Sequence, residues 1–249
     1  MANPTAAICV IGDEILSGRT KDKNIGWIAE QLTAIGIQLS EARVIADEKE
    51  TIIRHITELS NANNYVFTSG GIGPTHDDIT TESVAAAFGV RVERSQEAIR
   101  RLEQHYKGTE IVLNEVRKKM ADIPVGATLI DNPVSAAPGF QLKNVYVMAG
   151  VPSIMQSMFE GLAAGLQGGT IPTRLTVQCS TGEGNVAHIL EEISDQYETV
   201  SVGSYPWFKP GQFGTAVVLT GLDKKFVASA AKELCQRVKE AGFEAEDAV

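Results

Sequence analysis

Residues Tyr65 to Ser83 read "YVFTSGGIGPTHDDITTES". The opening "YVFTS" is typical of a buried strand, and the residues that follow Ile79 favour a helix. Between them, three glycines and a proline predict a loop. A strand, a loop and a helix in this order form the repeating unit of parallel α/β sheets. In such sheets ligands bind beyond the carboxyl ends of the strands, so this stretch predicts both the fold class and the place of a site.

The residues on both sides continue the alternation of strands and helices. Two apolar runs before the loop, residues 5–11 and 37–45, favour strands, and each is followed by apolar residues at helical spacing. After the loop we expect helices over 80–89, 95–108 and 114–123, strands over 127–132, 139–144 and 145–150, and a helix that begins at Pro152. The pattern predicts a three-layer αβα fold around a mostly parallel sheet, spanning residues 1–168.

A second, smaller domain is expected over residues 174–249. The segment "GGTIPT" at 168–173 interrupts the pattern with two glycines and a proline, which is typical of a domain boundary. The order strand, helix, strand, strand, helix that follows predicts an α+β sandwich. Within it, "GSYPWFKPGQFGT" at 203–215 is interpreted as a proline-glycine hairpin with aromatic residues in the core rather than as a binding loop. The final "EAEDAV" is expected to be frayed.

Composition limits the classes of function. The chain has 249 residues, of which 43% are hydrophobic, and a formal net charge of −9. This balance predicts a soluble protein and argues against nucleic-acid binding, and "RKK" at 117–119 is typical of a solvated helix face. Cys9, Cys179 and Cys235 fit no zinc spacing and indicate buried free thiols in a reducing compartment. Without a signal peptide or a membrane-spanning stretch, we expect a cytoplasmic protein whose partner is a small molecule, with no membrane association.

The glycine-rich loop is the first candidate for ligand binding. It matches neither the Walker motif nor the dinucleotide-binding fingerprint. Gly70, Gly71 and Gly73 permit positive φ angles and let the backbone approach a ligand closely. Thr75 adds a hydroxyl group, and the N–H groups at the start of the following helix suit an anion. The composition of the loop therefore favours a phosphate group as the ligand.

Asp77 and Asp78 place two negative charges beside this expected anion site. A divalent cation such as Mg²⁺ would reconcile them, because it binds carboxylate and phosphate oxygens together. Asp77 could instead accept hydrogen bonds from a pterin or a ribose, or act as a base, and the residues alone do not separate these roles. The structural alternative is a pair of turns in which Asp78 caps the helix, but a cap needs one aspartate and the loop has two.

Two further loops are candidates for the same site. After the first strand, Asp13 and Glu14 begin an acidic loop, which would lie beside the glycine loop if the first and third strands are neighbours. For Asp13 a plain loop role is supported equally well, and Asn24 at the end of this loop is expected to cap a helix. Pro152 and Ser153 form a second strand-to-helix entrance, for which a binding role and a plain turn stay open. The loop at 131–140 is a weaker candidate for a cover over the site.

Four of these stretches together resemble the competence/damage-inducible protein A family: "IGDEILSGRTKDKN", "SGGIGPTHDDITTESVAAAFG", "NPVSAAPGF" and "MAGVPSIM". The first domain of that family is of the molybdopterin-binding type, which is shared with molybdenum-cofactor biosynthesis proteins and with the amino-terminal part of eukaryotic FAD synthase. The smaller second domain resembles the α+β module that follows it in the family. Many members continue into a nicotinamide-nucleotide amidase domain, and amidase activity is not expected of this sequence.

The resemblance implies both a site and an activity. Carried over residue by residue, the family's binding loop falls on Gly70, Gly71, Gly73, Thr75, Asp77 and Asp78, its first-strand acidic motif on Asp13 and Glu14, and its second helix entrance on Pro152 and Ser153. It implies a metal-dependent nucleotide pyrophosphatase, a hydrolase acting on ADP-ribose-like or FAD-like substrates, with Asp77 and Asp78 as metal ligands and Asp13 as a further catalytic residue. The alternative is a non-catalytic molybdopterin-binding module. A homo-oligomer is also expected on the resemblance.

Overall fold

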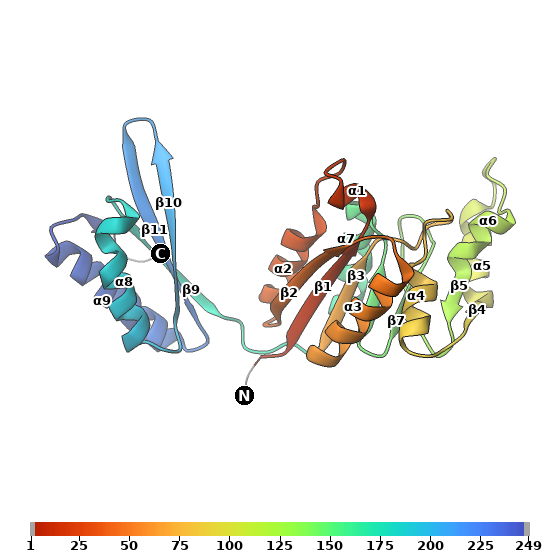
Figure 1. The fold of residues 1–249 in the computed structure, drawn as a ribbon, viewed down its shortest axis with the longest axis horizontal. Coiled ribbons are helices and arrows are strands. Elements are labelled where there is room, and N and C mark those ends of the chain that lie inside the picture. The colour runs from red at the N-terminus through yellow and green to blue at the C-terminus, as the bar shows by residue number, and fades with distance from the viewer. Residues whose placement is uncertain (1–2, 247–249) are drawn as a thin grey trace. The chain divides into compact units, whose positions relative to one another are not determined.

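The computed structural model describes residues 3–246. The chain divides into two compact units, residues 1–169 and 170–249, and the division falls inside the segment 168–173. Figure 1 colours the first unit from red to green and the second from teal to blue. Between residues 3 and 246, every helix is too short or too polar to cross a membrane.

The first unit is built on a six-stranded sheet with the strand order β2-β1-β3-β8-β7-β6. Four of its strands are parallel, namely β2 (Gln38–Ile45), β1 (Thr5–Ile11), β3 (Tyr65–Ser69) and β8 (Val145–Met148). Strand β7 (Gly139–Leu142) is antiparallel to both of its neighbours, β8 and β6 (Thr128–Ile130). The first and third strands are neighbours, as predicted, and Val10 pairs with Ser69. The loops after these two strands therefore leave the sheet at the same edge.

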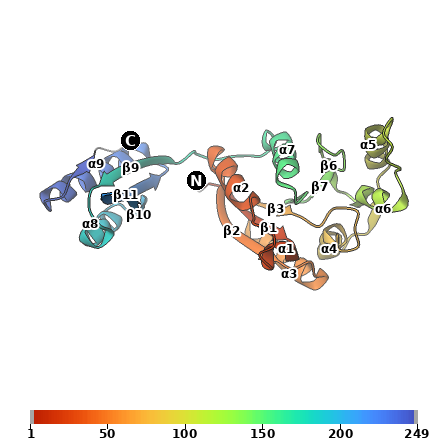
Figure 2. The ribbon, with the colours of Figure 1, turned by 90° about the horizontal axis from the view of Figure 1, so that it is seen from above.

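Helices cover both faces of this sheet (Figure 2). One face packs against α3 (Lys49–Ala62) and α4 (Thr80–Ala87), and the other packs against α2 (Asn24–Ala34) and α7 (Pro152–Ala163). Along β1 the side chains alternate between the two layers, with Ala7 and Cys9 on the first face and Ala6 and Ile8 on the second. Both faces are buried, which explains why the strand is continuously apolar. The predicted three-layer αβα fold is confirmed.

One predicted helix is mostly wrong. Residues 114–123 form only a four-residue helix, α6 (Glu115–Lys118), then a 3₁₀ turn, η1 (Lys119–Ala121), and a strand, β5 (Asp122–Pro124). The strand pairs with β4 (Val92–Arg94), which lies before α5 (Gln96–Tyr106). Pro124 lacks an N–H group and cannot continue a helix, while Ile123 is buried in the main core. The first loop also differs from a plain loop, because Asp13–Leu16 form the short helix α1.

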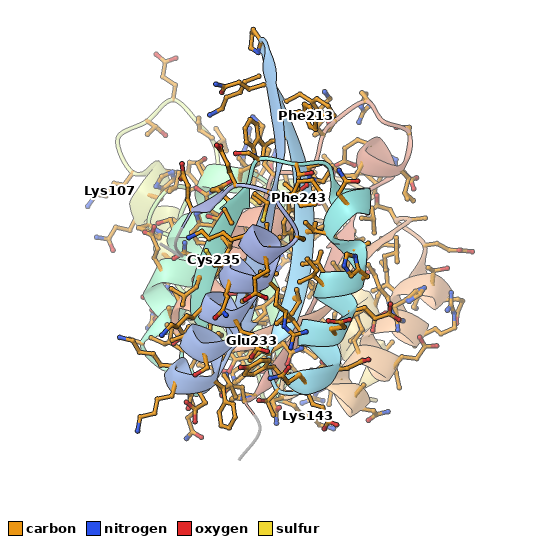
Figure 3. The ribbon with its side chains drawn as sticks, turned by 90° about the vertical axis from the view of Figure 1, so that its left-hand side faces the viewer. Lys107, Lys143, Phe213, Glu233, Cys235 and Phe243 are labelled. Atoms are coloured by element: carbon orange, nitrogen blue, oxygen red, sulfur yellow. The ribbon has the colours of Figure 1, made fainter. Side chains whose placement is uncertain are left out.

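The second unit is a four-stranded antiparallel sheet with two helices on one face. Its strand order is β10-β11-β9-β12, formed by Ser201–Lys209, Gln212–Gly221, Thr173–Cys179 and Ala245–Glu246 respectively. Helices α8 (Glu183–Gln196) and α9 (Lys224–Glu240) pack on it, and Cys179 and Cys235 lie in this core. Figure 3 shows Cys235 and Glu233 on α9. All three cysteines are buried, as predicted, and none of them forms a disulfide within residues 3–246. Because β12 pairs with β9, the frayed end expected at 244–249 is wrong for Ala245 and Glu246, and residues 247–249 lie outside the described part.

The hairpin of the second unit is confirmed, but its aromatic residues do not lie in the core. Phe208, Tyr205 and Phe213 are 83%, 60% and 57% exposed. The hairpin extends past the ends of α8 and α9 in Figure 1, and Figure 3 shows Phe213 toward its tip. Trp207 is half-buried, and Lys209 lies with its Nζ 5.2 Å from the centre of the Trp207 ring.

Candidate ligand-binding site

A cleft of about 460 Å³ opens at the carboxyl edge of the first sheet. Its volume is in the range of pockets that bind small organic ligands. Three segments far apart in the sequence line it: residues 70–73 after β3, residues 149–154 around the start of α7, and residues 132–137 before β7. Of the residues predicted for the site, those in the lining are Gly70, Gly71, Gly73, Asp78, Glu14 and Pro152. Asp13, Thr75, Asp77 and Ser153 lie outside the lining.

The glycines are required by the backbone at the floor of this cleft. Gly70 and Gly71 have φ angles of 110° and 68°, in the region that favours glycine. A Cβ atom on Gly71 would collide with the Thr80 hydroxyl, and one on Gly70 would collide with the carbonyl oxygen of Ile11. Within residues 3–246, the N–H groups of Gly71 and Ile72 donate no hydrogen bond. They leave the floor of the cleft with two donors available to an acceptor on a ligand.

Asp78 fastens the glycine loop internally. Its Oδ1 accepts a hydrogen bond of 2.7 Å from the Gly73 N–H, and its Oδ2 accepts bonds of 2.8 Å from the Thr75 N–H and 2.5 Å from the Thr75 hydroxyl. Helix α4 has Ile79 as its N-cap residue, without a side-chain cap. The interpretation of Asp78 as the helix cap is therefore wrong. The carboxylate holds the loop that precedes the helix.

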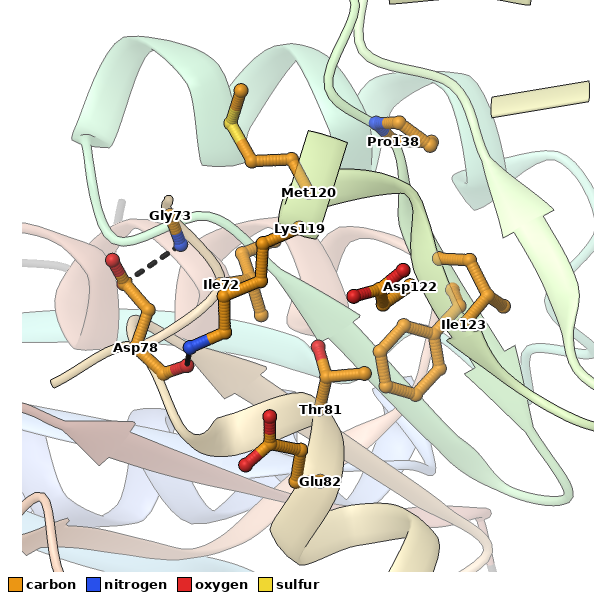
Figure 4. Close-up of a pocket in the computed structure, with 11 residues that line it drawn as sticks. Ile72, Gly73, Asp78, Thr81, Glu82, Lys119, Met120, Asp122, Ile123 and Pro138 are labelled. Carbon is orange, nitrogen blue, oxygen red and sulfur yellow. Dashed lines mark hydrogen bonds between the residues drawn. The ribbon is translucent and has the colours of Figure 1, made fainter. Parts of the chain in front are cut away.

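Lys119 holds the same loop from the other side. Its ammonium donates hydrogen bonds of 3.1 Å to the Thr75 carbonyl and 2.8 Å to the Asp78 carbonyl. Figure 4 shows two of the contacts of Asp78, with the Lys119 ammonium at its backbone and the Gly73 N–H at its carboxylate. A small pocket separates this contact from β5 and β7, and its lining includes Thr81, Glu82, Asp122 and Phe140. The interpretation of residues 117–119 as a solvated helix face is wrong for Lys119.

Asn24 ties the glycine loop to the second helix entrance. It is only 4% exposed, and its Nδ2 donates to the Ser69 hydroxyl at 2.7 Å and to the Gly150 carbonyl at 2.9 Å. The expected capping role is wrong, because Asp22 accepts the hydrogen bonds from the first N–H groups of α2, those of Asn24 and Ile25. Asn24 thereby joins the first turn of α2 to the ends of β3 and β8.

Carboxylates converge at the rim of the cleft. Asp47, which follows β2, accepts a hydrogen bond of 2.9 Å from the Asp13 N–H. Burial raises the pKa of Asp47, and the charges of Asp13, Glu14 and Asp77 raise it further against the opposing effect of that N–H. The pKa of Asp77 is lowered, chiefly because the Thr75 hydroxyl lies close to it, with smaller contributions from His76 and Lys119. The acidic loop and the glycine loop therefore lie together, as their neighbouring strands predicted.

Asp47 was not predicted from the sequence. It lies in "IADEKE", a polar run between a strand and a helix, where an aspartate is a common turn residue. One signal in the sequence could have indicated Asp47, namely its position after the second strand. Strand β2 ends at the same sheet edge as β1 and β3, so the residue after it lies near their loops. His76, the histidine inside the glycine loop, has a side chain that is 98% exposed and lies outside the cleft lining.

The loop at 131–138 forms one wall of the cleft. The Asn132 side chain is buried and fixes this loop, accepting bonds from the N–H groups of Val134 and Ser135 and donating to the Ser135 hydroxyl and the Ala137 carbonyl. In the lining segment 149–154, Pro152 is the first residue of α7, as predicted, while Ser153 is exposed.

The predicted metal ligands do not form a complete metal site by themselves. Within residues 3–246, no three histidine, cysteine, aspartate or glutamate side chains are placed together so as to hold a metal ion. Mg²⁺, however, is commonly bound by one or two carboxylates together with substrate phosphates. The mutual repulsion around Asp47 is of the kind that a cation relieves. The donor set thus fits a cation shared with a ligand phosphate and does not fit an all-protein cage.

The fold and the site define a class of protein. The chain belongs to the family described as the probable molybdopterin-binding domain, whose family model matches residues 7–167. The family model of the middle domain of FAD synthase matches residues 173–247. Together these matches confirm the two-part resemblance that the sequence motifs indicated.

Two relatives and one solved structure are similar to different shares of this chain. A protein from Archaeoglobus fulgidus is 32% identical over 226 residues, which cover 91% of this chain and 94% of the relative. A probable FAD synthase from Caenorhabditis briggsae is 32% identical over 86% of this chain, but the match covers only 46% of the relative. The structure of CinA from Thermoplasma acidophilum, a protein described as of unknown function, matches 66% of this chain and 99% of its own with a TM-score of 0.61 and 30% identity.

Proposed function

We propose that the first unit is a nucleotide pyrophosphatase that holds the phosphate groups of an ADP-ribose-like or FAD-like substrate on Gly70–Gly73. The observation that carries the proposal is the cleft floor, where the N–H groups of Gly71 and Ile72 have no partner within the described residues. Backbone N–H groups held in fixed positions bind phosphate without a flexible side chain. The similarity to a probable FAD synthase, which extends over 86% of this chain, supports a nucleotide as the ligand.

In this proposal the loop aspartates have different functions. Asp78 has both of its oxygens engaged in loop hydrogen bonds, so its role is to keep the N–H groups in place. Asp77 and Asp47 would hold Mg²⁺ or a similar divalent cation together with the substrate phosphates, with Asp13 beside them. The cation supplies charge neutralisation at the phosphates when it is bound.

The reaction consumes one water molecule. The water oxygen forms a bond to one phosphorus atom, the bond between that same phosphorus and the bridging oxygen breaks, and the bridging oxygen leaves with the other phosphate. With ADP-ribose the products are AMP and ribose 5-phosphate, and the proton released from water is accepted at the carboxylate rim.

The test is turnover of ADP-ribose by the full chain. We expect chromatography to show AMP and ribose 5-phosphate in MgCl₂, with no products in EDTA. Asp77→Asn should lower kcat by about 10²-fold, the usual effect of losing a charged catalytic group. Asp195→Asn, an exposed carboxylate on α8, provides the matched control and should leave turnover unchanged. Equal turnover by wild type and Asp77→Asn would reject the assignment.

A second function is a non-catalytic module that binds molybdopterin. It is favoured by one observation, the lack of a preformed three-ligand metal group among residues 3–246. The phosphate of the pterin would bind the same N–H groups, and the cleft rim would accept hydrogen bonds from the pterin. Calorimetry distinguishes the two functions. Metal-independent binding of molybdopterin, with no turnover of ADP-ribose, would support the module, and failure of molybdopterin to bind would remove it.

A further inference from the structure

We propose that Lys119 is a positioning residue that holds the glycine loop in its ligand-binding conformation, an inference that rests on the proposed function for its ligand. Lys119 begins η1 and lies 41 and 44 residues beyond Asp78 and Thr75, whose carbonyl groups accept its hydrogen bonds. The contact therefore joins the β4–β5 region of the unit to the loop. Neither the motifs nor the family resemblance pointed to this residue.

Lys119 and Asp78 act on opposite groups of the same short loop. The Asp78 carboxylate accepts from the N–H groups of Gly73 and Thr75, whereas the Lys119 ammonium donates to the carbonyl groups of Thr75 and Asp78. Thr75 is held at both its N–H and its carbonyl. Because a trans peptide is planar, fixing the Thr75 carbonyl also fixes the direction of the next N–H group, that of His76.

The charge of Lys119 lies next to the glycine loop, because Lys119 lines the small pocket together with Gly73 and Asp78. Within the described residues Lys119 takes part in no ion pair, since both of its acceptors are neutral carbonyl groups. The neighbouring Lys118, in contrast, pairs with Glu115 at 2.8 Å. A partly buried ammonium beside a phosphate site attracts the anion and offsets the two loop aspartates. Lys119 thus supplies both the geometry and the charge that a phosphate needs at this loop.

Three substitutions separate these contributions. Lys119→Met removes charge and hydrogen bonds, Lys119→Gln retains a donor without the charge, and Lys119→Arg retains both. Lys118→Met removes a neighbouring lysine that does not contact the loop. Two quantities are measured on the full chain: hydrogen exchange of the segment 71–77 without ligand, and the Kd for ADP-ribose by calorimetry.

We expect Lys119→Met to accelerate exchange in segment 71–77 by about tenfold or more and to raise the Kd by a similar factor, the scale of losing hydrogen bonds to a charged group. Lys119→Arg should restore much of both, and Lys118→Met should change neither. If Lys119→Met lowers only the overall Tm, with exchange in 71–77 and Kd as in wild type, the proposal is overturned. If the wild type binds no ADP-ribose but the exchange effect persists, the role of Lys119 stands and the proposed substrate is wrong.

Discussion

The side-chain amide of Asn24 donates a hydrogen bond of 2.7 Å to the hydroxyl of Ser69, at the last residue of the strand that enters the glycine loop. The same nitrogen donates to the Gly150 carbonyl at 2.9 Å. One buried side chain therefore sets the spacing between the floor of the cleft and one of its walls. Position 24 is the first residue of α2, one residue after Lys23 at the N-cap position.

Replacing Asn24 tests this bracing role. Asn24→Ala leaves the Gly150 carbonyl without its donor, and we expect a loss of about 1–3 kcal/mol in the free energy of unfolding. Asn24→Asp keeps the shape but places an acceptor against that carbonyl, so it should be at least as damaging near neutral pH. Thr33→Ala, on the exposed side of the same helix, is the control. Urea unfolding measures all three, and an Asn24→Ala protein as stable as the control would contradict the account.

A comparison of Gly71 with Gly89 separates the cost of a positive φ angle from the cost of a steric collision. Gly71 and Gly89 have nearly the same φ, 68° and 66°, but a Cβ on Gly89 would meet no atom within 4 Å. Alanine at either position pays the cost of a positive φ, about 1–3 kcal/mol. Gly71→Ala also collides with the Thr80 hydroxyl and should lose about 1–3 kcal/mol more, together with ADP-ribose binding.

The double variant Gly71→Ala, Thr80→Ala should recover part of that additional loss, because the colliding hydroxyl is removed. Thermal unfolding and calorimetric titration provide the two readings. Equal destabilisation by Gly71→Ala and Gly89→Ala, with binding retained in both, would show that the close approach of Gly71 to Thr80 has no importance.

The two loop aspartates should respond differently to substitution. Asp78→Asn weakens the hold on the Gly73 and Thr75 N–H groups, so we expect faster hydrogen exchange in segment 71–77 and weaker ADP-ribose binding both with and without MgCl₂. Asp77→Asn leaves those hydrogen bonds intact and should affect only the Mg²⁺-dependent part of binding and turnover. Identical behaviour of the two variants would mean that the structure assigns their roles incorrectly.

The second unit has a titratable contact at Glu233, a residue of α9 that is labelled in Figure 3. The Tyr197 hydroxyl donates to Glu233 at 2.7 Å, and this bond, with Arg237, lowers the pKa of Glu233. A lowered carboxylate pKa stabilises the fold above the ordinary value of 4.5, and the effect is lost as the pH falls through the folded-state pKa. Tyr197→Phe should therefore cost about 0.5–1 kcal/mol at pH 7 and less below pH ~4. Calorimetry of the full chain at both pH values measures the difference in unfolding free energy between wild type and Tyr197→Phe. A difference that grows as the pH falls would contradict the prediction.

The fold and the location of the site could be predicted because both depend on local patterns. "YVFTS" followed by glycines and then by a helix is a local signal for a strand, a loop and a helix, and the carboxyl edge of the sheet follows from it. The first-strand loop was placed correctly because β1 and β3 are neighbours. The hairpin at 203–215 was predicted for a similar reason, but the exposure of Phe208 depends on how far the strands extend beyond the helices.

What could not be predicted are contacts across long sequence separations. Lys119 lies in a run of basic residues that is indistinguishable from an exposed helix face until its ammonium meets carbonyls 41 and 44 residues earlier. Asp47 lies in a polar turn, and its pKa is raised first by burial and then by the charges of carboxylates that are distant in the sequence. Asn24 has the ordinary position of a cap, and only the tertiary structure shows that Asp22 has taken that role.

The central claim is that a ligand phosphate lies on the N–H groups of Gly71 and Ile72. A crystal structure of the full chain soaked with ADP-ribose and MgCl₂ tests it most directly. The account predicts phosphate density within hydrogen-bonding distance, about 2.7–3.2 Å, of both nitrogen atoms, with Asp77 or Asp47 facing a bound cation. Density for ADP-ribose at another place on the first unit, with this cleft left to solvent, would contradict it.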